Sequence, residues 1–256
     1  MLCSINELKG FDIVATDGEI GSVAQFYFDD EQWALRYIVV NTGNWLSDRQ
    51  VLISPFSVTE MDRDDRKLYV SLTKNQVEKS PNIDTRKPVS RQMEATYSDY
   101  YGYPYYWGSP FLWGAVALPV LGAQRAATVM SNATTVPSTE QLIPADVHLR
   151  STQEVTTYHI AATDGEIGHV EDFIVEDDNW RIRYLAIDTR NWWPGRKVIV
   201  SPQWISSIDW AQGKVHVNLS RDGIKQSPEY DISKVLSRGY EKELHHHYGQ
   251  AGYWTE

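Results

Sequence analysis

Thr16-Asp17-Gly18-Glu19-Ile20-Gly21 is the stretch that decides the fold, because it returns letter for letter as Thr163-Asp164-Gly165-Glu166-Ile167-Gly168. Each occurrence is followed by a segment rich in Val, Ile and aromatic residues. Gly accepts the positive φ that a tight hairpin turn requires, so an Asp-Gly pair in this setting predicts a β-hairpin. The sequence therefore predicts the same hairpin twice, at an offset of 147 residues.

The offset holds without a gap from Leu2 to Trp107 and from Leu149 to Trp254, which indicates a tandem duplication. We predict a first repeat at residues 1–107, a linker at 108–148 and a second repeat at 149–256. The composition of 131–139 is typical of a flexible linker. The apolar stretch 111–123 is expected to fold back onto a repeat, with contact to a membrane surface or a partner as the alternative.

Each copy has the pattern of short antiparallel strands. The run Trp33–Val40 is apolar on both faces apart from Arg36, which is typical of a strand covered on both sides in a small closed barrel. The predicted fold is mainly β, with two tandem small antiparallel β-barrels, each followed by short helices and an aromatic tail. The central strand positions that we expect to be buried are Val39, Ile53, Ala186 and Val200.

A helix is predicted after each barrel, because aromatic and apolar residues recur at helical spacing near 90–101 and 236–248. Gly102 and Gly249 stand where a helix C-cap needs positive φ. Both tails then finish in Tyr-Trp, at Tyr106-Trp107 and Tyr253-Trp254. We expect each tail to pack on a barrel, and we hypothesise that the two tails exchange between the copies.

Composition excludes several classes of protein. Hydrophobic residues make up 42% and charged residues 23%, so the chain is not disordered throughout. A net charge of −10 does not favour binding of nucleic acid. The single cysteine, Cys3, precludes an internal disulfide and a cysteine-based metal cluster. No signal peptide or membrane-spanning run is evident, so a cytoplasmic location is expected, with a place at the edge of a membrane complex left open.

The Asp-Gly turn, Glu-Ile-Gly, the acidic turn, Trp, and then Arg-Tyr with β-branched residues resemble the PRC-barrel domain, at about 8–84 and again at 155–231. The family is named for the cytoplasmic domain of the photosynthetic reaction centre H subunit, and it includes a domain of a ribosome maturation factor. The chain resembles stand-alone bacterial proteins with two tandem PRC-barrel repeats. The resemblance implies a docking module rather than an enzyme.

The expected function is therefore a non-enzymatic, protein-binding docking module, whose protein partner the sequence does not identify. Two alternatives stay open. One is a soluble relative of the H subunit acting in photosynthetic electron transport, and the other is a ribosome-assembly accessory. A homo-oligomer is a further open alternative, and no cofactor is expected.

Candidate partner-contact residues are those of a loop between two strands, because an exposed Trp on a loop is a common interface anchor. They are Asn44, Trp45, Asn191, Trp192 and Trp193. The other explanation is that each Trp caps its own barrel or the other copy.

The remaining candidates are interpreted as structural, so no catalytic, cofactor-binding or metal-binding residue is predicted. His245-His246-His247 is expected on an ordinary helix surface, because consecutive helical residues point about 100° apart. The acidic turns 29–31 and 176–178 are interpreted as hairpin turns rather than cation sites. Arg36 and Arg183 are each expected to pair with a carboxylate and to lie against aromatic rings.

Overall fold

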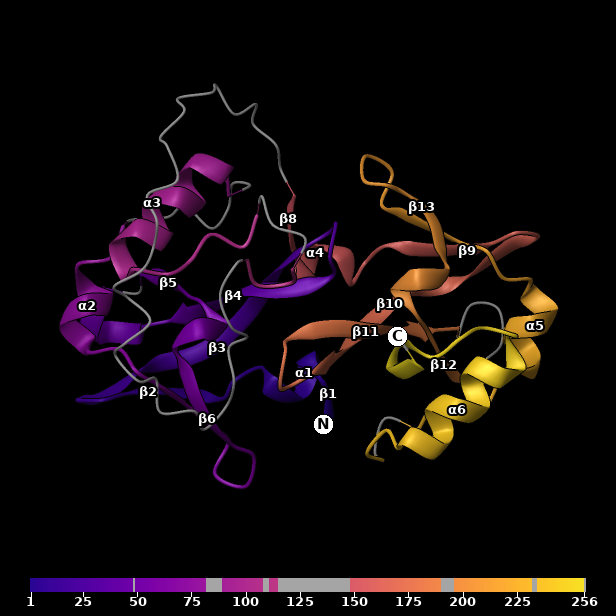
Figure 1. Cartoon of the computed structure of the whole chain (residues 1–256), viewed down its shortest axis with the longest axis horizontal. Coiled ribbons are helices and arrows are strands. Elements are labelled where there is room, and N and C mark those ends of the chain that lie inside the picture. Colours follow the sequence, from indigo (N-terminus) through magenta and orange to yellow (C-terminus); the bar gives the residue numbers. More distant parts are fainter. Residues whose placement is uncertain are drawn as a thin grey trace. The chain divides into compact units, whose positions relative to one another are not determined.

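The computed structural model describes residues 1–47, 49–81, 89–107, 111–114, 148–189, 196–231 and 234–255. The fold is mainly β, as predicted, and the residues divide into two compact units (Figure 1). The first-copy unit comprises Gly10–Gln32 and Arg36–Arg150. The second-copy unit comprises Met1–Lys9, Trp33–Leu35 and Ser151–Glu256.

The strands of the first-copy unit run in the order β4-β3-β2-β7-β6, with β5 on β4 and β8 on β3. The β2 and β7 strands are parallel, whereas β2–β3, β4–β5 and β6–β7 are antiparallel. The elements are β2 (Asp12–Ala15), β3 (Gly18–Asp29), β4 (Ala34–Asn41), η1 (Gly43–Leu46), β5 (Gln50–Ile53), η2 (Pro55–Ser57), β6 (Val58–Asp62), β7 (Lys67–Val70), α2 (Lys74–Glu78), α3 (Arg91–Tyr101) and β8 (Leu149–Ser151).

The second-copy unit repeats this order as β11-β10-β9-β14-β13, with β12 on β11 and β1 on β10. Its β9 and β14 strands are again parallel. The elements are β1 (Leu2–Ser4), α1 (Ile5–Leu8), α4 (Thr152–Val155), β9 (His159–Ala162), β10 (Gly165–Glu176), β11 (Arg181–Asp188), β12 (Lys197–Val200), η4 (Pro202–Trp204), β13 (Ile205–Asp209), β14 (Lys214–Val217), α5 (Arg221–Gln226), α6 (Arg238–His247) and η5 (Tyr253–Thr255).

Strand register also recurs at the offset of the sequence repeat. Ile38 pairs with Ile53 in the first copy, and Leu185 pairs with Val200 in the second. The prediction of two closed antiparallel barrels is nevertheless not confirmed, because the strand order of each described sheet does not close on itself. The parallel β2–β7 and β9–β14 pairs also make each sheet mixed rather than antiparallel.

A glycine after each hairpin turn fixes how closely two strands approach. A Cβ at Gly21 would lie 1.9 Å from the carbonyl oxygen of Asn41, and one at Gly168 would lie 2.0 Å from that of Asp188. No side chain fits at such distances, and the φ values of 155° and 150° disfavour other residues as well. This close approach explains why both copies have glycine at this position.

The predicted core positions Val39, Ile53, Ala186 and Val200 are fully buried, which confirms that prediction. We expect Val39→Ala to lower the free energy of unfolding by about 1–3 kcal/mol, through lost apolar burial and the cavity left behind. Chemical denaturation measures this change. The exposed β6 residue Glu60 provides the control, since Glu60→Ala should change stability by less than about 0.5 kcal/mol. Equal effects of the two substitutions would contradict the burial of Val39.

Short strands, rather than the tails, are exchanged between the copies. The β1 strand, from the start of the first repeat, pairs with β10 of the second repeat. Its counterpart β8, from the start of the second repeat, pairs with β3 of the first. The tails stay with their own repeats, because Tyr106 contacts Arg36 and Tyr253 contacts Arg183. The hypothesis of exchanged tails is therefore wrong.

Candidate functional site

The tail of the first copy begins with helix α3, whose ends follow from the sequence. Ser90 is the N-cap and accepts a hydrogen bond from the Met93 backbone N–H. Gly102 ends the helix with a φ of 67°, as predicted for a C-cap glycine. Tyr97 is buried and donates a hydrogen bond to the Leu52 carbonyl of β5. The helix is thus fixed to the sheet by an aromatic residue on its inner face.

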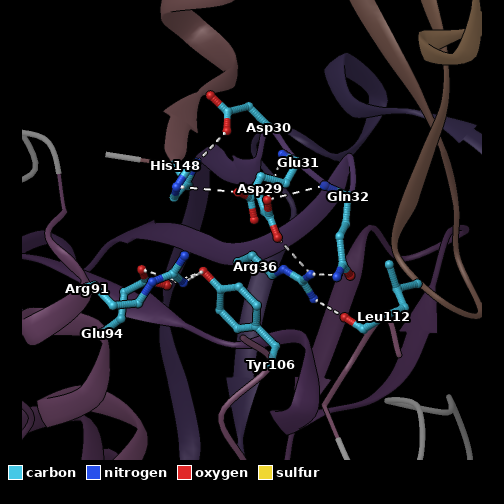
Figure 2. A network of polar contacts seen from close by, with 10 residues as sticks. All are labelled: Asp29, Asp30, Glu31, Gln32, Arg36, Arg91, Glu94, Tyr106, Leu112 and His148. Carbon is cyan, nitrogen blue, oxygen red and sulfur yellow. Dashed lines mark hydrogen bonds and ion pairs between the residues drawn. The ribbon is translucent and has the colours of Figure 1, made fainter. Parts of the chain in front are cut away.

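A buried arginine connects this tail to the sheet (Figure 2). Arg36 Nη2 donates to Asp29 Oδ2 at 2.9 Å, and both side chains are almost completely buried. Its Nη1 donates to the Leu112 carbonyl at 2.6 Å. The guanidinium lies over the rings of Tyr106, at 3.9 Å, and Trp113, at 4.7 Å. The interpretation of Arg36 as a structural ion pair lying on aromatic rings is confirmed.

A second carboxylate of the same network belongs to the helix. Glu94 pairs with Arg91 at 3.2 Å and accepts a hydrogen bond from the Tyr106 hydroxyl. Burial raises the pKa of Glu94 to about 7, and this effect outweighs the hydrogen bond from Tyr106 and the charge of Arg91, which act in the opposite direction. Glu94 therefore changes its protonation state close to neutral pH.

This pKa predicts a pH-dependent stability. The pKa of Glu94 in the folded protein lies above its ordinary value of 4.5, so the folded state binds this proton more tightly than the unfolded chain does. The resulting stability is fully present below pH 4.5 and is lost as the pH rises through about 7. The groups that face Glu94 are Arg91, Tyr106, Asp29 and Arg36.

We expect Glu94→Gln to remove this dependence, because glutamine keeps the shape without the titration. The wild type should lose about 3 kcal/mol relative to the variant between pH 4.5 and pH 8. Urea denaturation of both proteins across this range measures the difference. A constant difference between the two proteins at every pH would contradict the assignment.

The acidic turn after β3 contacts residues 148–150, at the start of β8. The Glu31 N–H donates to Asp29 Oδ1 at 2.8 Å, which confirms the structural role of this turn. Arg150 Nε donates to Asp30 Oδ2 at 2.9 Å. His148 Nδ1 lies 3.2 Å from Asp30 Oδ1 (Figure 2). These contacts fix the β8 strand at its start.

Exposed aromatic side chains lie on the first tail and, at Phe111, just after it. Tyr100, Tyr105 and Phe111 are 41%, 40% and 68% exposed, and we call these three residues the tail surface. The Tyr100 hydroxyl donates to the Gln76 carbonyl at 2.8 Å, and the Tyr105 hydroxyl donates to Asp99 at 2.6 Å. The hydrogen bond to Asp99 raises the pKa of Tyr105 to about 12. Both rings are therefore held in place although they are exposed.

A series of ring contacts joins the tail surface to the buried network. Tyr100 packs on Tyr101, with ring centroids 4.8 Å apart, and Tyr101 stacks on Tyr103 at 5.4 Å. Tyr103 stacks on Phe56 at 5.9 Å, and Phe56 contacts Trp113 at 5.0 Å. Since Trp113 lies against Arg36, these contacts connect the exposed Tyr100 ring to the buried network.

The second tail has a similar buried hydrogen-bond network, in which some of the residues differ. Glu241 accepts hydrogen bonds from Tyr184 at 3.0 Å and from Tyr253 at 2.8 Å. His245, in place of Ser98, is only 2% exposed and contacts the Tyr184 hydroxyl at 3.0 Å. Burial lowers the pKa of His245. The prediction that His245 lies on an ordinary helix surface is therefore wrong; its neighbour His246 is exposed.

The exposed aromatic positions are not kept in the second copy. His247 stands at the position of Tyr100, and Gly252 at that of Tyr105. His247 is tied to the Gly223 carbonyl at 2.7 Å. The sequence signal for the tail surface was this difference between otherwise matched tails, and it was not used in the prediction of site residues.

The predicted contact loop is only partly accessible. Asn44 is exposed, but Trp45 is half-buried and donates its indole N–H to the Ile20 carbonyl. Lys74 Nζ lies 4.9 Å from the centroid of the Trp45 ring. The other three predicted contact residues, Asn191, Trp192 and Trp193, lie outside the described residues. A role of this loop in partner binding stays a prediction.

Comparison with known proteins finds a PRC-barrel domain at residues 3–77. This range extends from β1 through most of α2 and contains the first Thr-Asp-Gly-Glu-Ile-Gly motif. No curated protein matches the chain significantly. Within the described ranges, no helix has the length and apolar character needed to cross a membrane. No group of three or more His, Cys, Asp or Glu side chains there is arranged to hold a metal ion.

Proposed function

We propose that this protein is a non-enzymatic docking module that binds a protein partner through the tail surface of its first copy. The observation that carries the proposal is the exposure of Tyr100, Tyr105 and Phe111. Among the described residues, the other large hydrophobic side chains that are exposed are Met1 and Val235. Three of these five exposed side chains thus lie on the first tail or just after it.

The chemistry of these side chains suits an interface. Aromatic residues are enriched in protein interfaces and frequently contribute most of the binding free energy. The hydrogen bonds of Tyr100 and Tyr105 hold the rings before a partner arrives, so little side-chain entropy is lost on binding. The charged groups beneath them are buried and paired, which supports a structural role for that network rather than catalysis.

We also propose that residues 155–231 form a second PRC-type domain. The repeated motif, the matching strand order and the matching register at the same offset support this proposal. The two copies then differ in role, because His247 and Gly252 replace the exposed tyrosines. The second copy supports the fold, while the first presents the tail surface. Within the described residues, nothing favours a photosynthetic or a ribosomal partner over another protein.

The test is the triple substitution Tyr100→Ala, Tyr105→Ala and Phe111→Ala. We expect at least a tenfold loss of the partner that the wild type captures from native lysate, with each substitution at a hot spot costing about 2 kcal/mol. Quantitative mass spectrometry of the captured protein measures the loss. The matched control is Val235→Ala, which truncates an exposed apolar side chain of the second copy.

Two results would contradict the proposal. One is full retention of the partner by the triple variant. The other is loss of the partner on substitution of Asn44, an exposed residue of the contact loop, while the triple variant still binds. Circular dichroism and the melting temperature of each variant show whether it remains folded.

A further inference from the structure

The N-terminal segment Met1–Lys9 folds with the second copy although its sequence belongs to the first. The PRC-barrel match begins at residue 3, within β1. In the structure, Leu2, Cys3 and Ser4 pair with Glu176, Val175 and Ile174 of β10. This segment therefore pairs alongside β10, a strand that lies far from it in the sequence.

A buried carboxylate of the second copy binds this segment. Asp172 is 1% exposed and accepts hydrogen bonds from the Ser4 hydroxyl and from the Asn6 backbone N–H, the latter at 3.1 Å. Asn6 Nδ2 also donates to the Glu171 carbonyl at 3.2 Å. The first copy has Gln25 at the position of Asp172, so this acceptor is particular to β10.

Apolar side chains complete the attachment. Ile5 and Leu8 of α1 are 1% and 0% exposed, and Cys3 is 4% exposed. One short segment, residues 1–9, therefore makes the strand pairing with β10, the hydrogen bonds to Asp172 and the apolar contacts. The chain then leaves the second-copy unit between Lys9 and Gly10, where Gly10 has a φ of 76°.

We infer that β10 also accepts the N-terminal segment of a second copy of this chain, which gives strand-exchanged homo-oligomers. All the contacts just described are made by residues 1–9, so the same contacts form when another molecule supplies the segment. Exchange of an identical element is a low-cost route to dimers, because no contact is lost. Strand exchange is already the rule within the chain, since β8 likewise pairs with the opposite repeat. The population of exchanged species rises with protein concentration.

A disulfide reports directly which chain supplies the strand. Cys3, the single cysteine, pairs with Val175 across the strands. Cα atoms of directly opposed residues in an antiparallel pair lie about 4.5–5.5 Å apart, which is within the range of a disulfide. The wild-type chain is mixed with an affinity-tagged Cys3→Ser/Val175→Cys chain at increasing concentrations, and the mixture is then oxidised. Only a strand of the wild-type chain seated on β10 of the tagged chain brings the two cysteines together.

The expected result is a disulfide-linked heterodimer whose yield increases with concentration. The control acceptor is Cys3→Ser/Ser206→Cys, whose exposed cysteine on β13 measures cross-linking by random encounter. A heterodimer yield no higher than that of the control, up to millimolar concentrations, would overturn the inference.

A second measurement does not depend on the folding of the cysteine variants. Unmodified chains with and without isotope labels are mixed at high concentration and examined by native mass spectrometry. Mixed-label dimers that are lost when residues 1–9 are deleted from every chain support the exchange, because such chains have no segment to exchange. A full-length chain that stays monomeric throughout, or mixed-label dimers that persist after the deletion, would overturn it.

Discussion

Arg36→Met should destabilise the protein by about 3–5 kcal/mol, because it leaves the carboxylate of Asp29 buried without its partner. Asp29 is 3% exposed, so water does not replace the lost guanidinium. The substitution also removes the hydrogen bond to the Leu112 carbonyl and the contact with the Tyr106 ring. Chemical denaturation at pH 7 measures the change.

Two matched variants separate the charge from the packing. In Asp29→Asn/Arg36→Met the amide oxygen still accepts from the Glu31 N–H of the turn, but no charge is buried, so we expect most of the lost stability to return. Arg183→Met removes the equivalent pair in the second copy, where the side chains of Arg183 and Glu176 are 13% and 15% exposed. Its effect should be smaller, at about 1–2 kcal/mol. Equal effects of the two single substitutions would show that burial does not determine the cost.

Deletion of residues 238–256 should lower the melting temperature strongly and expose apolar surface that binds the dye ANS. Helix α6 buries Leu244, Glu241 and His245 almost completely. Removing it uncovers the Trp204 ring, which packs on His245 at 5.1 Å. At about 25 cal/mol per Å², the lost burial of several large side chains amounts to several kcal/mol.

Lys242→Ala is the control for this deletion, because Lys242 is exposed on the same helix. It should leave both the melting temperature and ANS binding unchanged. A truncated protein that melts like the full chain and binds no dye would mean that the second tail is not structural.

Local features of the fold followed from the sequence because they depend on residues close together in the chain. A steric or periodic requirement within a single copy determines each of three such features: the Asp-Gly turns, the cap at Gly102 and the burial of Val39. The pairing of Arg36 with a carboxylate followed in the same way, since an arginine in an apolar strand requires a buried partner, whereas the structure identifies that partner as Asp29.

Strand exchange could not be predicted from the sequence, and the reason is physical. The segments 2–4 and 149–151 differ only in their middle residue, Cys3 or Arg150, and their acceptor strands β3 and β10 have similar apolar patterns. Hydrophobic patterning therefore fits either segment to either copy. The prediction of closed barrels relied on a strand that is apolar on both faces. A helix and a tail that pack over the second face of such a strand account for the same pattern without closure of the sheet.

The burial of His245 had a signal in the sequence that was not used. Glu241, Leu244, His245 and Tyr248 follow the i, i+3, i+4, i+7 spacing of one helix face. Treating the three histidines as one group obscured that His245 lies on this face and His246 does not. The exposure of the Tyr100 and Tyr105 rings could not be predicted from the sequence, because residue spacing alone does not distinguish a buried tyrosine such as Tyr97 from an exposed one.

The membership of β1 and β8 in opposite units has a consequence for how the chain is made. A nascent chain that has been translated to residue 107 contains the whole first repeat, yet it lacks β8, which the first-copy unit takes from residues 149–150. The first nine residues in turn have no β10 to join until the second repeat has been translated. Domains usually fold one after another from the N-terminus during synthesis. Here the two units reach completion only when translation is well into the second repeat, and β1 is synthesised before β2 to β7 but pairs with β10 only after them.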